Sequence, residues 1–301
     1  MTFVKRQLSV SFQLQSGAGS SASTQFAESG SNTVSLSNLR MSAKIIKSGD
    51  PTLNKLDLTI YGMTLSLMNQ LSTFGQQINL IRPSLVTVTA GDALSTVFQG
   101  NVQHAWSDFQ GAPDVPFHVE AFSGLMGGIQ PMPPTSFQGS QDAAQIMQQC
   151  ASKMNLSFEN NGVGNKLSDP YFWGSPRSQA QQCAESGNFN WAIDDSTLAI
   201  WPKNKARSGG AVTISPQNGM ISYPSFTAAG ILVRTLFNPQ IKFGAQVQVQ
   251  SSLGRANGTW NIIGLSHELE SQLPKGQWFS TLECWNPSQQ GNPTAPVSQI
   301  Q

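Results

Sequence analysis

Residues 104–122 (HAWSDFQGAPDVPFHVEAF) and residues 267–285 (HELESQLPKGQWFSTLECW) share the pattern that decides the expected fold. In each segment a histidine is followed 16 residues later by a glutamate, and an aromatic residue stands two positions after the glutamate. A segment that recurs in one chain indicates a recurring structural unit. The pattern therefore predicts two similar β-modules, with these repeat landmarks: His104, Glu120, Phe122, His267, Glu283 and Trp285.

An alternating segment also precedes each histidine, Val86-Thr87-Val88-Thr89 in the first copy and Val247-Gln248-Val249-Gln250 in the second. Any two amphipathic hairpins share such alternation, so the prediction depends mainly on the equally spaced His and Glu. Coincidence between antiparallel strands is the alternative to duplication. The copies also differ, since Leu269 stands where the first copy has Trp106.

Composition points to a soluble protein with a weakly charged surface. The chain has 301 residues, enough for two or three domains with cores of their own. Only 11% of the residues are charged, against about 25% in ordinary soluble domains. A surface built from Ser, Thr, Asn and Gln is easier to desolvate than an ionised one, which suits a protein covered by other subunits. The net charge of +1 argues against a nucleic-acid-binding protein.

The cysteines and the first residues indicate a protein assembled in the cytoplasm. Cys150, Cys183 and Cys284 are too few and too widely spaced for a disulfide framework, so we expect buried thiols. Residues 1–6 carry positive charge, but no apolar segment follows them, so we expect no signal peptide. No apolar run approaches the ~20 residues of a membrane span.

The first 125 residues predict an all-β domain that contains one short helix. Alternation predicts strands at residues 8–15, 34–46, 55–61, 84–89, 97–106 and 115–122. Residues 16–32 are rich in Ser, Gly and Ala and predict a long mobile loop. Thr64 is the expected N-cap of a helix that carries Leu67, Met68 and Leu71.

Residues 126–208 predict a small α+β insert. Residues 124–134 contain three glycines and three prolines and predict no regular element. Ser140 or Asp142 then caps an expected helix, and a second helix at about 177–186 ends with Gly187 in the C′ position. Two strands are expected to follow, at 190–194 and 197–202.

Residues 209–286 predict the second β-barrel domain. The expected strands cover residues 211–214, 219–223, 231–236, 245–250, 260–269 and 277–285. Residues 287–301 predict a flexible tail or an arm that docks on a partner. The fold class is therefore mainly β with an α+β insert, with two β-barrel domains related by duplication.

No motif predicts a catalytic residue, a cofactor or a metal. In a strand, Glu268 projects away from His267, so this segment supplies at most one metal ligand to each face. The duplicated His/Glu pairs could act as acid–base couples, but structural devices recur more readily than active sites. Asp194 and Asp195 could resemble the carboxylate pair of a glycosidase, yet Asp-Asp-Ser-Thr is more typical of a turn between strands.

Several other signatures are incomplete. The glycine-containing segments at 17–19 and 162–164 lack the rest of a phosphate-binding loop. Trp260, Trp278 and Trp285 follow the strand pattern, so we expect them in a core or an interface and not in a sugar-binding platform.

Seven short segments of the C-terminal region carry a family resemblance: Gly219–Phe226, Gly230–Val233, Leu236–Pro239, Gly244–Val249, Trp260–His267, Gln277–Trp278 and Thr281–Trp285. With these segments the region resembles the C-terminal barrel of baseplate hub proteins from contractile-tailed bacteriophages. The resemblance is good over 209–286, weaker over 1–125, and limited to the order of elements in the insert. The base of secretion-system spike proteins is related to this family.

The resemblance implies a non-enzymatic homotrimer in which each chain supplies two tube-like barrels. Six barrels would form a pseudo-sixfold ring that stacks under the hexameric tail tube, holds the trimeric central spike and contacts other baseplate proteins. DNA would pass through the channel without specific binding, and the protein would belong to the virion. The alternative is a carbohydrate-binding or glycan-cleaving tail protein, which the seven tryptophans and the low charge would suit.

Overall fold

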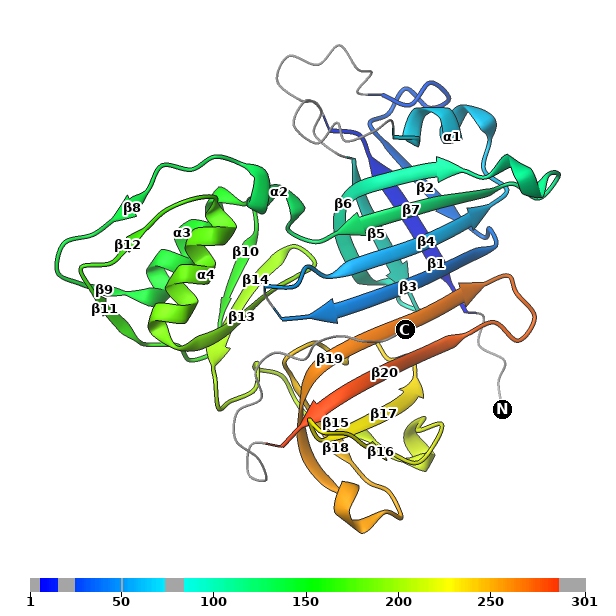
Figure 1. Ribbon diagram of the computed structural model, residues 1–301. Coiled ribbons are helices and arrows are strands. Elements are labelled where there is room, and N and C mark those ends of the chain that lie inside the picture. Colours follow the sequence, from blue (N-terminus) through cyan, green and yellow to red (C-terminus); the bar gives the residue numbers. More distant parts are fainter. Residues whose placement is uncertain (1–5, 16–24, 50, 74–83, 287–301) are drawn as a thin grey trace. The chain divides into compact units, whose positions relative to one another are not determined.

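The computed structural model describes residues 6–15, 25–49, 51–73 and 84–286 (Figure 1). The chain divides into two compact units. Unit 1 comprises Met1–Ile45, Lys55–Ser123 and His267–Trp278, and unit 2 comprises Ile46–Asn54, Gly124–Ser266 and Phe279–Gln301. The expected tail at 287–301 lies outside the described residues, as do positions 16–24 of the expected loop.

Unit 1 contains an antiparallel sheet with the strand order β2-β1-β5-β6-β7-β4 (Figure 1). Its strands are β1 (Leu8–Gln13), β2 (Thr33–Ser37), β4 (Lys55–Tyr61), β5 (Leu85–Ala90), β6 (Ser95–Ser107) and β7 (Pro116–Phe122). β3 (Met41–Ser48) belongs to unit 1 as far as Ile45. The predicted strands account for all of these except that the single segment predicted at 34–46 is divided into β2 and β3, since period-two alternation is a local signal that does not mark the break between them.

The alternation in these strands produces the core of unit 1. In β1 every second side chain is buried, and the same holds in β4 and β5. Each large apolar side chain removed from water contributes about 1.5–3 kcal/mol. The largest fully buried side chains of this unit are Phe12, Phe26, Met41, Ile45, Leu56, Leu58, Ile60, Phe98 and Phe117.

Two short helices and one turn complete unit 1. Helix α1 (Leu65–Leu71) begins as predicted, since the Thr64 side chain accepts a hydrogen bond from the Leu67 N–H and the predicted apolar face is buried. The 3₁₀ helix η1 (Phe109–Gly111) lies between β6 and β7. Within the expected loop, the Phe26 N–H donates to the Ser31 carbonyl and the Phe26 ring is fully buried, so residues 25–32 form an anchored turn.

The segment at 124–134, predicted to be irregular, contains helix α2 (Leu125–Ile129), so that prediction was wrong. The glycines are used for close packing. A Cβ at Gly127 would lie 2.3 Å from the Met154 sulfur, so a larger residue there would force the Met154 side chain to move. The prolines begin after the helix, at Pro131.

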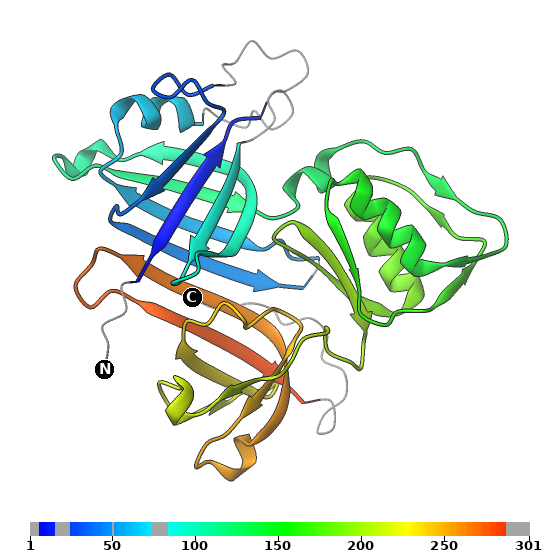
Figure 2. The same cartoon turned by 180° about the vertical axis from the view of Figure 1, so that it is seen from behind.

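Helices α3 (Ala143–Lys153) and α4 (Pro176–Gly187) lie side by side against a three-stranded sheet of order β10-β14-β13 (Figures 1 and 2). Asp142, and not Ser140, is the N-cap of α3, because its carboxylate accepts from the Ala144 N–H. At the end of α4, Asn188 adopts the left-handed conformation that was expected of Gly187. Between these helices lie Ala143, Ile146, Met147, Cys150, Ala180, Cys183 and other buried residues.

The strands of this α+β segment are mostly short. The hairpin β13 (Phe189–Asp194) and β14 (Thr197–Pro202) was predicted, whereas the others were not, since two to four residues carry little periodicity. The unpredicted strands are β8 (Thr135–Ser136), β9 (Ser140–Asp142), β10 (Ser157–Asn160), β11 (Lys166–Ser168) and β12 (Tyr171–Phe172).

The remaining strands of unit 2 surround an apolar core. They are β15 (Val212–Ile214), β16 (Ser225–Phe226), β17 (Ile231–Leu236), β18 (Gln246–Val249), β19 (Gly258–Ser271, of which unit 2 holds the part up to Ser266) and β20 (Trp278–Trp285, from Phe279). The 3₁₀ helices η2 (Pro216–Asn218) and η3 (Gly254–Ala256) connect them. The core includes Ile214, Ile231, Val233, Val247, Val249, Trp260, Ile262 and Leu282.

The strand predicted at 219–223 is not a strand. Met220 forms a single bridge with Thr235, and the chain turns at Gly219, whose φ is +91°. Pro224 then removes a backbone donor before β16 begins. The mainly β fold class with an α+β segment is confirmed, and the duplication stays a prediction.

Candidate functional site

The first pair of landmarks lies on the two strands of one hairpin. The register of β6 and β7 places His104 directly opposite Glu120. The register shifts between Val102 and His104, so β6 carries an irregularity just before the histidine. Phe122 is half-buried at the end of β7. The structure therefore brings the first His and Glu together, although they are 16 residues apart.

Glu120 also belongs to an exposed ion-pair cluster. Lys55 Nζ lies 2.8 Å from Asp57 Oδ1 and 3.5 Å from Glu120 Oε1. The hydrogen bond to Asp57 raises the pKa of Lys55. All three side chains remain about a third exposed. We name these three residues the hairpin cluster.

The second pair of landmarks has a different environment. His267 is buried, with 3% of its surface exposed. Glu283 lies against Gly264, because a Cβ at Gly264 would be 3.2 Å from the Glu283 Cβ. Burial raises the pKa of Glu283. Trp285 is buried at the end of β20, and the role of all six residues as repeat landmarks stays a prediction.

The third histidine, which the sequence did not single out, packs against an exposed tryptophan. The rings of Trp106 and His118 stack with centroids 5.2 Å apart and an interplanar angle of 23°. Thr59 Oγ1 lies 3.2 Å from His118 Nδ1. Trp106 keeps 43% of its surface exposed, so this pair presents an aromatic face on unit 1.

Five charged side chains of unit 2 form a second, largely buried cluster, which we name the junction cluster. Lys47 Nζ lies 2.7 Å from Asp194 Oδ1 and 3.1 Å from Asp195 Oδ2. Arg207 Nη1 donates to Asp194 Oδ2 at 2.7 Å. Arg207 also donates from Nε and Nη2 to the two oxygens of Glu159, at 2.9 and 2.7 Å. Asp194 is thus shared between two cations.

Burial and ion pairing shift the pKa values of these side chains in opposite directions. Burial alone would raise the pKa of Asp194, but the neighbouring Lys47 and Arg207 hold that pKa well below its usual range. Burial alone would lower the pKa of Lys47, but Asp194 and Asp195 raise it above its ordinary value. Hydrogen bonds from Arg207 lower the pKa of Glu159. These shifts keep Asp194, Lys47 and Glu159 ionised near neutral pH.

Hydrogen bonds and aromatic packing hold the same region of unit 2. Asn54 Nδ2 donates to the Ile193 carbonyl at 2.8 Å, and the Arg207 N–H donates to the Gly244 carbonyl at 2.7 Å. The rings of Trp201 and Phe243 meet edge to face, 6.1 Å apart. These contacts join residues 46–54, the β13–β14 hairpin and residues 207–244 into one body.

Sequence reasoning missed the junction cluster. Asp194 and Asp195 were assigned to a turn, which is correct, since Asp195 has a left-handed φ of +56° between β13 and β14. Lys47, Glu159 and Arg207 were not singled out. The alternation of β3 could have indicated Lys47, because it places this lysine on the buried face of the strand. A lysine is seldom buried without a partner of opposite charge.

The clusters offer little for catalysis. In the junction cluster each carboxylate is bound to a cation. Burial raises the pKa of Cys150 to about 11 and that of Cys183 to about 12, so neither thiol is a ready nucleophile. Among the described residues, no group of three His, Cys, Asp or Glu could hold a metal ion. No helix in the described ranges is long and apolar enough to cross a membrane.

Surface aromatic residues are the other feature of possible functional importance. Trp260, Trp278 and Trp285 are buried, as the strand pattern predicted. Tyr171 and Trp173 on the α+β segment are 60% and 62% exposed, and Tyr223 and Phe226 are 67% and 58% exposed. Exposed aromatic side chains in such numbers are typical of interaction surfaces.

The fold is similar to those of solved tail and secretion proteins. The 43 kDa tail protein of prophage MuSo2 from Shewanella oneidensis has a TM-score of 0.62 and 12% identity, covering 94% of this chain and 98% of that one. The c3393 protein of E. coli, a type VI secretion component described as similar to the T4 tail proteins gp27 and gp5, has a TM-score of 0.54 and 8% identity, covering 82% and 73%. A PdpA–VgrG complex of Francisella has a TM-score of 0.52 and 10% identity, covering 97% and 54%.

The assignment to a family comes from the sequence. No curated protein sequence matches the chain. The family model described as baseplate hub gp41 matches residues 8–284, which is nearly the whole chain. This chain therefore belongs to the baseplate hub gp41 family and is a structural component of a phage tail baseplate.

Proposed function

We propose that the protein forms a homotrimeric ring with pseudo-sixfold symmetry that joins the hexameric tail tube to the trimeric central spike. The observation that carries this proposal is the family match over residues 8–284. The similarity in fold to a type VI secretion component, described as similar to gp27 and gp5, supports a position next to the spike.

The pseudo-sixfold symmetry requires two similar barrels in each chain. Unit 1 and the strands of unit 2 within 212–266 and 279–284 each have a β-rich apolar core, which is consistent with two barrels. Three chains would then supply six barrels, three of each kind. Such a ring matches sixfold neighbours on one side and threefold neighbours on the other.

The weakly charged composition supports a structural role next to DNA. A channel that is lined with many Lys and Arg residues would bind the DNA phosphates and slow its passage. The net charge of +1 suits a conduit that does not retain DNA. We further propose that the protein is not an enzyme, that it contacts the tube, the spike and other baseplate proteins, and that it assembles in the host cytoplasm.

The oligomeric state tests the proposal. Light scattering of the purified protein should give a mass near three times 32.4 kDa. A stable monomer at micromolar concentration would contradict the trimer.

A second candidate function is glycan binding by a tail protein. The observation that favours it is the exposed pair Tyr171 and Trp173, which stand two residues apart in the α+β segment. The backbone of Trp173 is fixed, because Gln182 Nε2 donates to its carbonyl at 2.8 Å. Titration calorimetry with cell-wall and lipopolysaccharide glycans checks this function, and no heat with any of them would exclude it for those sugars.

A further inference from the structure

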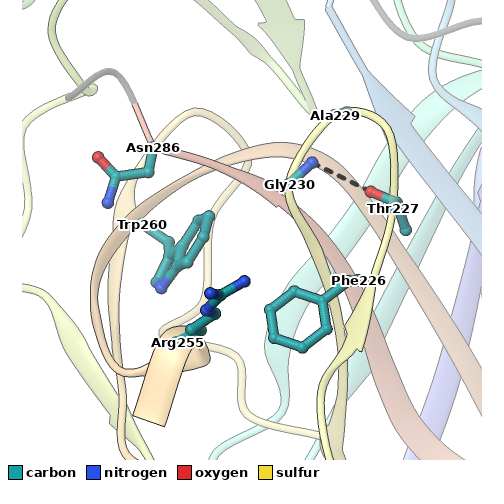
Figure 3. A pocket seen from close by; sticks show the side chains of 7 residues that line it. All are labelled: Phe226, Thr227, Ala229, Gly230, Arg255, Trp260 and Asn286. Carbon is teal, nitrogen blue, oxygen red and sulfur yellow. Dashed lines mark hydrogen bonds between the residues drawn. The ribbon is translucent and has the colours of Figure 1, made fainter. Parts of the chain in front are cut away.

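A pocket of about 390 Å³ lies within unit 2 (Figure 3). Its walls are the turn at residues 226–230, Arg255 of η3, Trp260 of β19 and Asn286 after β20. The volume is at the lower end of the range of small-ligand pockets, so it can hold one or two side chains of a partner.

Two walls of the pocket are fixed by hydrogen bonds. The Thr227 N–H donates to the Gly230 carbonyl at 2.9 Å, and the Gly230 N–H donates to Thr227 Oγ1 at 3.1 Å (Figure 3). Gly230 has a φ of +153°, and a Cβ there would lie 2.3 Å from the Cys284 carbonyl oxygen. Trp260 Nε1 donates to the Ala256 carbonyl at 3.0 Å. The pocket is therefore formed before any ligand binds.

Arg255 is the one charged residue among those that line the pocket. In Figure 3 its side chain lies between the rings of Trp260 and Phe226. Within the described part of the chain, Arg255 makes no hydrogen bond and no ion pair. A guanidinium presents several parallel N–H donors that match a carboxylate, and aromatic neighbours favour its planar face.

The segment that leads to Phe226 in the pocket wall carries exposed apolar side chains. Ile221, Tyr223 and Phe226 are 43%, 67% and 58% exposed, and residues 219–226 contain no charged side chain. Aromatic residues together with arginine are enriched in protein interfaces. The site thus combines one unpaired positive charge with apolar contact surface.

This combination favours an acidic peptide over a nucleic acid. Binding to DNA or RNA through phosphates requires several cations, whereas this site supplies one. Residues 287–301 contain no Asp or Glu, so that part of the chain has no acidic side chain to offer. We propose that the Arg255 pocket binds an acidic segment of another protein. An Asp or Glu carboxylate pairs with Arg255, and a neighbouring apolar side chain packs against Phe226. That the other protein is a baseplate component rests on the proposed function.

A random peptide library, displayed and selected on the immobilised full-length protein, tests this inference. The selected peptides should be enriched in Asp or Glu next to an aromatic or aliphatic residue. Such a peptide, made synthetically, should bind the Arg255→Glu variant at least about tenfold more weakly, because a charge-assisted hydrogen bond is lost and a repulsion is added. Phe226→Ser should also weaken binding.

Lys205→Glu is the matched control, since Lys205 is exposed, does not line the pocket and undergoes the same change in charge. It should bind the peptide with the affinity of the wild type. Arg255 and Phe226 are exposed, so we expect circular dichroism and the melting temperature to stay unchanged in both variants.

Selected peptides without acidic preference, or equal affinity of the wild type and Arg255→Glu, would overturn the inference. Binding of a fluorescent single-stranded oligonucleotide that is lost in Arg255→Glu would also overturn it, in favour of a nucleic-acid site. The mass of the wild-type protein, measured by light scattering in the same experiment, separates the two proposals. A monomer that still selects acidic peptides refutes the trimer and keeps the pocket, and a trimer that selects none does the reverse.

Discussion

Lys47 and Lys55 each contact two carboxylates, but they do so in opposite environments. In the junction cluster, Lys47 is 7% exposed and lies 2.7 and 3.1 Å from Asp194 and Asp195. In the hairpin cluster, Lys55 is 34% exposed and lies 2.8 and 3.5 Å from Asp57 and Glu120. Distances alone would rank the two lysines as nearly equal. Burial separates them.

The difference in burial decides how much each cluster contributes to the stability of the protein. Water screens the hairpin cluster, so its ion pairs contribute little. In the junction cluster, Lys47, Asp194 and Arg207 are at most 7% exposed, so these three charges depend on their partners because water cannot replace them. The junction cluster connects residues that are far apart in sequence, and its loss should loosen the attachment of the β13–β14 hairpin within unit 2. Four predictions test this contrast, in order of decreasing effect.

The largest effect is expected from Asp194→Ala. Removing the shared carboxylate leaves Lys47 and Arg207 buried with fewer partners, and the free energy of unfolding should fall by about 3–5 kcal/mol. Denaturant unfolding followed by tryptophan fluorescence measures this change. Asp57→Ala in the hairpin cluster is the control and should cost less than about 1 kcal/mol. Equal losses in the two variants would contradict the contrast.

Double-mutant cycles should give a smaller but clear difference. The coupling between Lys47 and Asp194, measured with Lys47→Met, Asp194→Asn and the double variant, should reach about 1–3 kcal/mol. The coupling between Lys55 and Asp57, measured with Lys55→Met and Asp57→Asn, should be about 0.2–1 kcal/mol. If both cycles give the same coupling energy, burial does not distinguish the clusters.

Lowering the pH should reduce the stability of the protein, because protonation of Asp194 removes its ion pairs in the junction cluster. Because the folded-state pKa of Asp194 is lowered, its contribution is present above the unfolded pKa of about 4 and is lost as the pH falls toward the folded pKa. Between pH ~4 and ~2 the wild type should therefore lose stability more steeply than Asp194→Asn, by up to about 1.4 kcal/mol per pH unit. Urea unfolding at several pH values measures both slopes, and parallel slopes would refute this assignment.

The smallest effect is expected from salt on the hairpin cluster. Lys55→Met should lower the free energy of unfolding by less than about 0.5–1 kcal/mol, and high salt should reduce the difference from the wild type further. Lys47→Met should show a difference that salt hardly changes, because the junction charges are buried. A large, salt-independent effect of Lys55→Met would show that the hairpin cluster is not screened.

The sequence predicted the long strands well, since their signal is local. Strands β4 and β17 have the predicted bounds, and α1 begins at the predicted Thr64. The register of the hairpins could not be predicted. His104 lies opposite Glu120 because the register of β6 and β7 shifts between Val102 and His104, and the spacing of two residues in the sequence does not show such a shift.

The junction cluster could not be predicted because it depends on tertiary structure. Lys47 and Asp194 are 147 positions apart, and no periodicity connects them. Helix α2 was missed because glycine count alone indicates a break, while in the structure Gly127 lies close to the Met154 side chain, a contact that the sequence does not show. The pocket at Arg255 joins η3, β19 and the turn before β17, which again only the fold brings together.

Single-particle imaging of the isolated protein tests the central claim most directly. The proposed hub should appear as a ring with a central hole, made of three chains and showing six similar densities around the axis. Compact particles without a hole, or a ring of any number of chains other than three, would contradict the proposed hub.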